Sequence, residues 1–362
     1  MSDELSRRSF IRNSSATAVT VGLAGLAGCT SSLPFIGGDG ADLSDWVFTP
    51  SFDDVLDNDD AEVEDLVTTD RSFVSIVPEA VYENEDDLET HRFVSIGSNI
   101  RGRSGAAAVD TDWALHQNVE WEYELSTSGP GTADVSAEIV AGEFDTGTVV
   151  DNLEKWAEDQ YGNDKDDEEV LESAGSQPGF ELYEVEGSAF GVSEEHLIQV
   201  EANHPVDPVA VVEAAIDAHE NETGRWTEDD DGGELLAEFD WGDFGVGALQ
   251  RPETVETELE DRYDDPDEAT EEEREAIEDD IDDWEYGLVG NGSSWTLDGD
   301  TSDLHQLFLY ESESDVDSDA LLEHVEANRD YDESWDTLED YSISEEGRAL
   351  ILTGEVQTQS IL

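Results

Sequence analysis

The chain has 362 residues, and its 96 Asp and Glu against 15 Lys and Arg give a formal net charge of −81 at pH 7. Binding to a nucleic acid needs clustered cations that neutralise phosphates, so this charge excludes DNA and RNA as partners. Hydrophobic residues make up 37% of the chain, with nine Trp, nine Tyr and twelve Phe, which is enough for a folded core and excludes an intrinsically disordered chain.

The first 28 residues have the pattern of a lipoprotein export signal. Arg7 and Arg8 form a twin-arginine motif, and the apolar run that follows is shorter than the roughly 20 residues of a membrane-spanning helix. The run ends in Leu-Ala-Gly before Cys29, a lipobox whose small residues admit a signal peptidase and whose thiol accepts a lipid. We therefore predict a signal peptide at 1–28, lipidation of Cys29 and a position on the outer face of the cell membrane.

This signal also restricts the chemistry of the mature chain. Cys29 is the only cysteine, and Met1, the only methionine, is removed with the signal. A lipidated Cys29 leaves no thiol for a disulfide and no sulfur ligand for copper, an iron–sulfur cluster or haem. The sequence therefore predicts no cofactor, and membrane lipid is the partner that it indicates most directly.

The acidic residues are best explained by the solvent. They are spread along the whole length, where their mutual repulsion would destabilise a compact chain in dilute salt. In molar salt the Debye length falls to about 3 Å and the repulsion is screened. We therefore expect a protein of an extreme halophile, most naturally a haloarchaeon.

Small and polar residues at 29–45 predict a flexible tether, and a first α+β domain is predicted over 46–250. Asp145 or Thr146 caps one predicted helix, and Asp207 with Pro208 opens another, because Asp is a preferred N-cap and Pro suits the first turn. The segment 78–89 is predicted as a turn and an acidic connection. Runs of β-branched and aromatic residues predict strands at 73–77, 93–96, 121–125, 135–144, 180–185, 189–192, 197–200 and 244–249.

An acidic helical insertion is predicted at 251–283, where pairs of apolar residues have the i, i+4 spacing of one helix face. A second α+β half is then predicted over 284–362, because Trp284-Glu285-Tyr286 repeats Trp121-Glu122-Tyr123. A Gly/Ser turn, a strand at 304–310, a capped helix at 318–328 and a final strand at 349–356 follow. The predicted fold is α+β, with antiparallel sheets, helices packed on one face and two similar halves.

Two sequence segments in the first predicted domain carry a family resemblance. Gly142-Glu-Phe-Asp-Thr146 precedes a predicted helix, and Gly179-Phe-Glu-Leu-Tyr-Glu184 opens a predicted meander. With this order of elements, residues 115–250 resemble repeat-built haloarchaeal twin-arginine lipoproteins of uncharacterised function. The resemblance is one of pattern, and it implies no catalytic residues.

The residues that most often bind metals show no convincing site. No two histidines have the H-x-x-x-H spacing of a helical zinc site, and His219 and His324 fall near the ends of predicted helices. The acidic run from Asp229 to Glu238 resembles a calcium loop, but Thr227 stands at the first ligand position, where Asp is needed. Asp298, Asp300 and Asp303 form a similarly weak match, so we predict no metal site. The histidines are His91, His116, His196, His204, His219, His305 and His324.

Two further features are candidate sites. Arg101 and Arg103, the sole cationic cluster of the mature chain, are predicted in a Gly-rich loop. They could clamp an anionic ligand by bidentate contacts, or they could pair with neighbouring carboxylates. Asn221 and Asn291 head Asn-x-Ser/Thr patterns in predicted surface turns, which makes both candidates for glycosylation outside the cytoplasm.

No motif for catalysis is present in the sequence. It has no G-x-S-x-G nucleophile elbow, and its carboxylates are too numerous to single out a pair. The expected function is a non-enzymatic, membrane-anchored extracytoplasmic lipoprotein that binds an envelope protein or a small ligand. The alternatives are an extracellular hydrolase with a carboxylate-based site and a structural component of the cell envelope.

Overall fold

The computed structural model describes residues 43–56, 63–84, 88, 98–105, 111–125, 129–162, 170–263, 266, 269–278, 281, 284–328 and 337–361. Arg7, Arg8, Cys29, almost all of the predicted tether and the predicted strand at 93–96 lie outside these residues. In the part of the chain that is described, no helix has both the length and the apolar character needed to cross a membrane.

The described residues form an α+β fold in which every paired strand is antiparallel to its neighbours, and two compact units can be separated. The N-terminal unit contains the described residues up to Glu83 and from 98 to Gly233, and the C-terminal unit contains Asn84, Leu88 and the residues from Glu234 onward. Antiparallel sheets with helices confirm the predicted fold class at this level.

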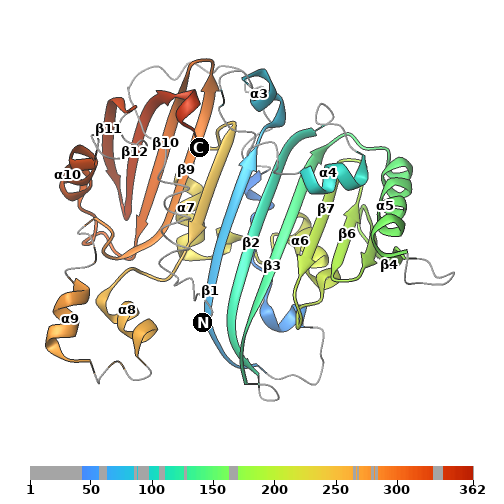
Figure 1. Ribbon diagram of the computed structural model, residues 1–362, viewed down its shortest axis with the longest axis horizontal. Helices are drawn as coiled ribbons and strands as arrows, with labels where there is room; N and C mark the ends of the chain where they lie inside the picture. Colours follow the sequence, from blue (N-terminus) through green and yellow to red (C-terminus); the bar gives the residue numbers. More distant parts are fainter. Residues whose placement is uncertain are drawn as a thin grey trace. The chain divides into compact units, whose positions relative to one another are not determined.

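Seven strands of the N-terminal unit pair in the order β1-β2-β3-β7-β6-β5-β4 (Figure 1). Six of them overlap predicted strands, whereas no strand was predicted for the edge strand β4, because its small and polar residues show no apolar alternation. The bounds are β1 Val63–Ile76, β2 Thr111–Leu125, β3 Gly129–Gly142, β4 Glu172–Gln177, β5 Phe180–Val185, β6 Ser188–Val192 and β7 His196–Ala202.

Helices cover both faces of this sheet, and the prediction of one covered face is wrong here. Trp156 of α5 (Thr146–Tyr161) contacts Phe190, whereas Val212 of α6 (Pro208–Asn221) packs against Gly191. Adjacent residues of a strand point to opposite faces, so α5 and α6 lie on opposite sides. The physical reason is that every residue of β6 is buried, which requires a cover on each face.

Local signals place the helices of this unit. Asp145 and Asp207 cap α5 and α6 as predicted, each accepting a backbone N–H at 2.8 Å, from Thr148 and Val209 respectively. Further helical segments are η1 (Phe52–Val55), α3 (Pro78–Glu83), α4 (Ser98–Ser104) and η5 (Trp226–Glu228). Of these, α3 replaces part of the turn predicted at 78–89. A further helix, α7 (Asp230–Glu238), contains the boundary between the units.

Five strands of the C-terminal unit pair in the order β8-β9-β10-β12-β11. Because β8 pairs with β9, it belongs to this unit and not to the domain predicted over 46–250. Trp284-Glu285-Tyr286 lies in a turn before β9, whereas Trp121-Glu122-Tyr123 lies inside β2, so this sequence match joins residues in different structures. The bounds are β8 Phe244–Leu249, β9 Leu288–Asp298, β10 Thr301–Tyr310, β11 Glu339–Glu346 and β12 Ala349–Gln357, with η7 at Thr358–Ser360.

The predicted Gly/Ser turn of the second half is in fact the strand β9. A Cβ atom at Gly290 would lie 2.8 Å from the side chain of Leu249, and one at Gly292 would lie 2.8 Å from the ring of Phe239. These glycines therefore permit close packing on the strand and do not form a turn.

The acidic insertion is helical, as predicted. It consists of α8 (Val255–Arg262) and α9 (Glu271–Glu278), which share a small core of Leu259, Ile277 and Ile281. The predicted C-terminal helix is α10 (Ser318–Asn328), and it packs beside β11.

Candidate functional site

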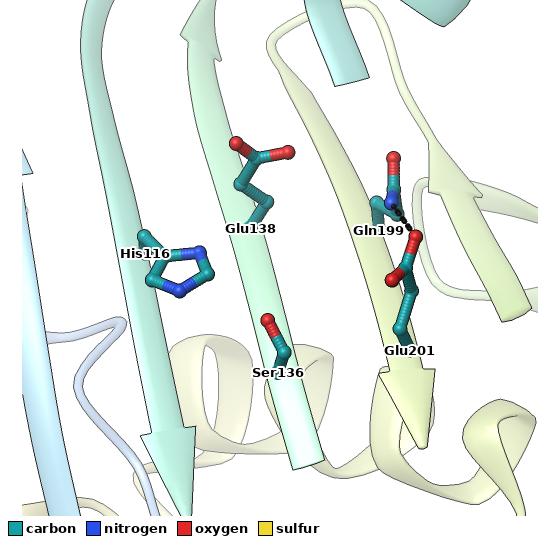
Figure 2. Close-up of a pocket in the computed structure, with 5 residues that line it drawn as sticks. All are labelled: His116, Ser136, Glu138, Gln199 and Glu201. Atoms are coloured by element: carbon teal, nitrogen blue, oxygen red, sulfur yellow. Dashed lines mark hydrogen bonds between the residues drawn. The ribbon is translucent and has the colours of Figure 1, made fainter. Parts of the chain in front are cut away.

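Five polar side chains of the N-terminal sheet line a small hollow (Figure 2). The helices α4 and α5 lie on the same face, because Arg103 pairs with Glu201 and Trp156 contacts Phe190, the strand partner of Gln199. His116 faces Glu138 across β2 and β3, while Glu138 faces Gln199 and Ser136 faces Glu201 across β3 and β7. The two-residue period of a strand therefore brings all five side chains to one face. The hollow is partly open to solvent, and its volume of about 20 Å³ is enough for a water molecule.

The floor of the hollow contains deeply buried polar groups. Glu138 is 5% exposed and Gln199 is 4% exposed. The Nε2 of Gln199 donates to Oε1 of Glu201 at 2.9 Å, whereas its own Oε1 is buried without a hydrogen-bond partner among the described residues. An unsatisfied buried acceptor costs about 1–3 kcal/mol, so a water molecule in the hollow would stabilise this arrangement.

His116 is held neutral at the edge of the hollow. Burial lowers its pKa, and a contact with Asn118 at 3.1 Å and the charge of Glu201 oppose that effect. A neutral imidazole beside a water-sized space could accept a proton.

The two candidate arginines lie in the helix α4 and not in a Gly-rich loop. The Nη1 of Arg103 is 2.8 Å from Oε1 of Glu201, and its guanidinium lies 4.3 Å from the ring centroid of Trp156. Burial lowers the pKa of Arg101, while Tyr82 and Glu138 attract its charge. Both arginines thus face carboxylates of their own chain, which is the alternative to anion binding.

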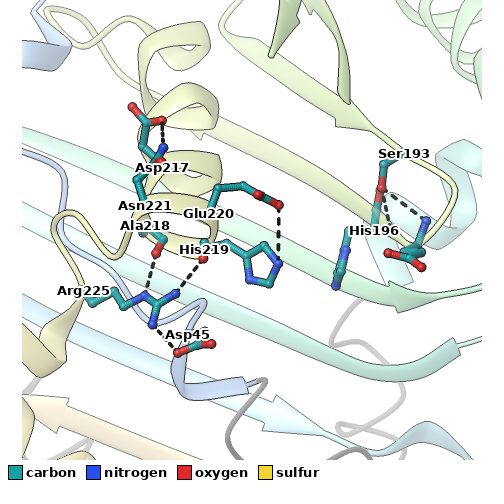
Figure 3. A network of polar contacts seen from close by, with 10 residues as sticks. Asp45, Ser193, His196, Asp217, Ala218, His219, Glu220, Asn221 and Arg225 are labelled. Carbon is teal, nitrogen blue, oxygen red and sulfur yellow. Dashed lines mark hydrogen bonds and ion pairs between the residues drawn. The ribbon is translucent and has the colours of Figure 1, made fainter. Parts of the chain in front are cut away.

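The opposite face of the same sheet holds an aromatic–histidine cluster of Trp46, Phe180, His196 and His219. Figure 3 shows the two histidines of this cluster. The rings of Trp46 and His219 stack with their centroids 4.2 Å apart, and His196 lies 4.8 Å from Trp46 and 5.4 Å from His219. Burial and the neighbouring His219 lower the pKa of His196 to about 4, so this imidazole is neutral at pH 7.

Arg225 closes the C-terminal end of α6 beside this cluster. Its Nε and Nη2 atoms each donate at 2.6 Å, to the carbonyls of Ala218 and His219, and Nη1 pairs with Asp45. His219 lies near the helix end as predicted, but Arg225 supplies the positive charge there. The arrangement fixes the first described segment of the chain to α6.

The run that resembled a calcium loop is a capped helix. The Oδ1 of Asp229 accepts the backbone N–H groups of Asp231 and Gly232, at 2.9 and 3.1 Å, and its Oδ2 pairs with Arg71 at 3.0 Å. In the C-terminal unit, burial and two nearby carboxylates raise the pKa of Asp303. Within the described ranges, no group of three or more His, Cys, Asp or Glu is arranged to hold a metal ion.

The remaining candidates are dispersed. His305 lies in β10, and His324 lies in α10 with its ring 4.8 Å from that of Trp284. Asn221 ends α6 and is exposed, but Asn291 lies within β9, so the predicted surface turn is wrong at Asn291. His91 lies outside the described residues.

Sequence reasoning missed the hollow as a unit. Its only local signal is a polar residue at every second position of a strand, as in Ser136 and Glu138. In a chain with 96 acidic residues this signal recurs in many segments, and only the pairing of β3 with β7 assembles the group.

The comparisons with known proteins identify no family. No family model matches the chain, and no curated protein matches it. Three solved structures of TP0453 each cover 80% of this chain: crystal form I (8% identity, TM-score 0.39, 90% of that chain), form III (9%, 0.37, 91%) and form IV (8%, 0.36, 89%).

Proposed function

We propose that the protein is a lipid-anchored binding module on the outer face of a haloarchaeal membrane, where it binds an envelope protein or a small ligand. The observation that carries this proposal is the sequence of Arg7, Arg8 and the lipobox before Cys29. The net charge of −81 supports a position exposed to concentrated salt.

Binding is favoured over catalysis by how the described polar groups are used. Glu201 is engaged by Arg103 and Gln199, and Glu138 lies near the buried cation of Arg101. Hydrolysis by two carboxylates requires both to reach one substrate, and both carboxylates of this hollow already interact with cations of their own chain. The hydrolase alternative therefore has less support than a binding role.

We also propose that the two units arose by duplication. In the N-terminal unit, β1-β2-β3 is followed by α5 and by a meander whose last strand, β7, pairs with β3. In the C-terminal unit, β8-β9-β10 is followed by α10 and by a hairpin whose last strand, β12, pairs with β10. The shared order of strands and helix supports this proposal more strongly than the three matching residues do.

The anchor is tested by fractionation of a halophilic host that expresses three forms of the full chain. The natural chain should be recovered in membranes with lipid on Cys29, and Cys29→Ser should be released into the medium. The combined change of Arg7 and Arg8 to Lys should retain the chain in the cytoplasm. If Cys29→Ser is associated with membranes as fully as the natural chain, the proposed anchoring through a lipid on Cys29 is contradicted.

The binding role needs a separate experiment. The natural chain is cross-linked on intact cells in high salt, and its neighbours are identified by mass spectrometry, with the secreted Cys29→Ser form as control. We expect a specific envelope protein, or a small ligand that raises the unfolding temperature of the purified chain. Hydrolysis of envelope glycans or esters by the purified protein would refute a non-enzymatic role.

A further inference from the structure

We infer that Asn221 carries an N-linked glycan and that Asn291, which heads the same sequence pattern, does not. The inference rests on the proposed export, because a chain that follows the twin-arginine route crosses the membrane folded. Glycan transfer outside the cytoplasm then meets the native structure, and only an accessible Asn-x-Ser/Thr segment can react.

The segment from Asn221 to Thr223 is accessible throughout. Asn221, Glu222 and Thr223 are all exposed at the C-terminal end of α6. Glu222 has a φ of +62°, which ends the helix and turns the chain outward after Asn221. A transferase could thus reach the carboxamide and the hydroxyl of Thr223 without opening any sheet.

The contacts of Asn221 are weak enough to exchange. Its Nδ2 donates to Oδ1 of Asp217 at 2.9 Å on the exposed surface, and the hydroxyl of Thr223 lies 3.4 Å from the carbonyl of Asn221. Exposed contacts in the last turn of a helix are readily replaced by water, so the carboxamide can be presented at little cost.

Asn291 has the opposite setting. It lies in β9 and is paired with Ala248 of β8 on one side and with Phe308 of β10 on the other. Ser293, whose hydroxyl completes the pattern, is 1% exposed. A transferase would have to open two strand pairings of the C-terminal sheet to reach this segment.

The reaction is a transfer from a polyprenyl-phosphate-linked sugar by an oligosaccharyltransferase. The Nδ2 of Asn221 forms a bond to the anomeric carbon of the sugar, and the bond from that carbon to the phosphate oxygen breaks. The lipid phosphate leaves with the bonding electron pair, and Nδ2 loses one proton to a base of the transferase. No oxidant or reductant is required.

The test uses the full chain isolated from the envelope of a halophilic host, with intact mass and peptide mass spectrometry. The natural chain and Asn291→Gln should carry the same glycan mass, and Asn221→Gln and Thr223→Val should lose all of it. Thr223→Ser keeps the required hydroxyl and should keep the glycan, which separates recognition from any change in folding.

The outcomes distinguish this inference from the proposed function. The inference is overturned if the chain is in the envelope fraction with an unmodified Asn221 or with a glycan on Asn291. Neither result contradicts the proposed lipid anchor. A chain retained in the cytoplasm overturns both, because export is the premise of each. A glycan on Asn221 that persists in Thr223→Val would show a different recognition pattern and would also refute the inference.

Discussion

The two faces of the N-terminal sheet place a partly buried histidine in different surroundings. His116 lies on the polar face, where Asn118 and the charge of Glu201 oppose the effect of burial on its pKa. His196 lies on the aromatic face, where burial and a second histidine both lower its pKa. One face therefore supplies partners that favour the charged form, whereas the other is stable only while its imidazole stays neutral.

This difference extends to how each face is held together. The polar face attaches α4 through Arg103, whose partners are the carboxylate of Glu201 and the ring of Trp156. The aromatic face depends on burial, with Trp46 fully enclosed. Molar salt weakens the first kind of contact and leaves the second intact, so the aromatic face should dominate stability in the proposed environment.

The largest effect is expected from removal of a ring on the aromatic face. Trp46→Ala should lower the free energy of unfolding by about 3–5 kcal/mol, because it leaves a cavity between His196 and His219. Urea titration in concentrated salt, followed by circular dichroism, measures this loss. Trp156→Ala on the polar face is the matched control, and an equal loss there would break the distinction between the faces.

Acid should destabilise the aromatic face next most strongly. The pKa of His196 is about 4 in the folded chain, against 6.5 for the ordinary group. As the pH falls from 6.5 to 4, the unfolded chain binds a proton that the folded chain does not. Stability is therefore lost through this window, by about 3 kcal/mol in total, and is unaffected by this group above it.

This acid effect can be separated from the titration of the many carboxylates by a variant. His196→Phe keeps a ring in the cluster and removes the titrating group. Unfolding free energies at pH 7 and pH 4.5 should differ less in the variant than in the natural chain. Parallel losses in the two proteins would mean that His196 does not account for the acid sensitivity.

The helices of the N-terminal unit could be predicted because their signals are local. Asp145 and Asp207 each cap a helix within a few residues of the apolar positions that the helix buries. By contrast, β9 was predicted as a turn, since Gly290 and Gly292 have no side chains to show the alternation of a strand. Their role depends on Leu249 and Phe239, which come from other elements of the chain.

The candidate site was still less accessible to sequence reasoning. The polar hollow needs β7 beside β3, although β4, β5 and β6 intervene in the sequence. The arginines of α4 were identified as a cluster, and pairing with carboxylates was one of two alternatives. Only the structure shows which carboxylate is involved, because Glu201 lies almost a hundred residues from Arg103.

A smaller effect is expected from the ion pair of the polar face. Arg103→Met should cost about 1 kcal/mol, since Glu201 is half exposed and the contact with Trp156 is a surface cation–π interaction. A double-mutant cycle with Glu201→Gln isolates the pair itself. The coupling free energy between Arg103 and Glu201 should shrink as salt is raised from dilute to molar. A coupling free energy that does not depend on salt would contradict an electrostatic interaction between the two side chains.

A substitution of Gln199 should have an effect no larger than that of Arg103→Met, and the sign of this effect is informative. Gln199→Leu removes the donor to Glu201 and also the acceptor that is buried without a partner in the part of the chain that is described. If a water molecule satisfies that acceptor, the substitution should destabilise the chain by about 1 kcal/mol, because two satisfied hydrogen bonds are lost. If the acceptor is truly unsatisfied, the substitution should be neutral or stabilising. Unfolding free energies of Gln199→Leu and of Gln199→Glu, which keeps an acceptor at this position, would then show whether the hollow is a hydrated site.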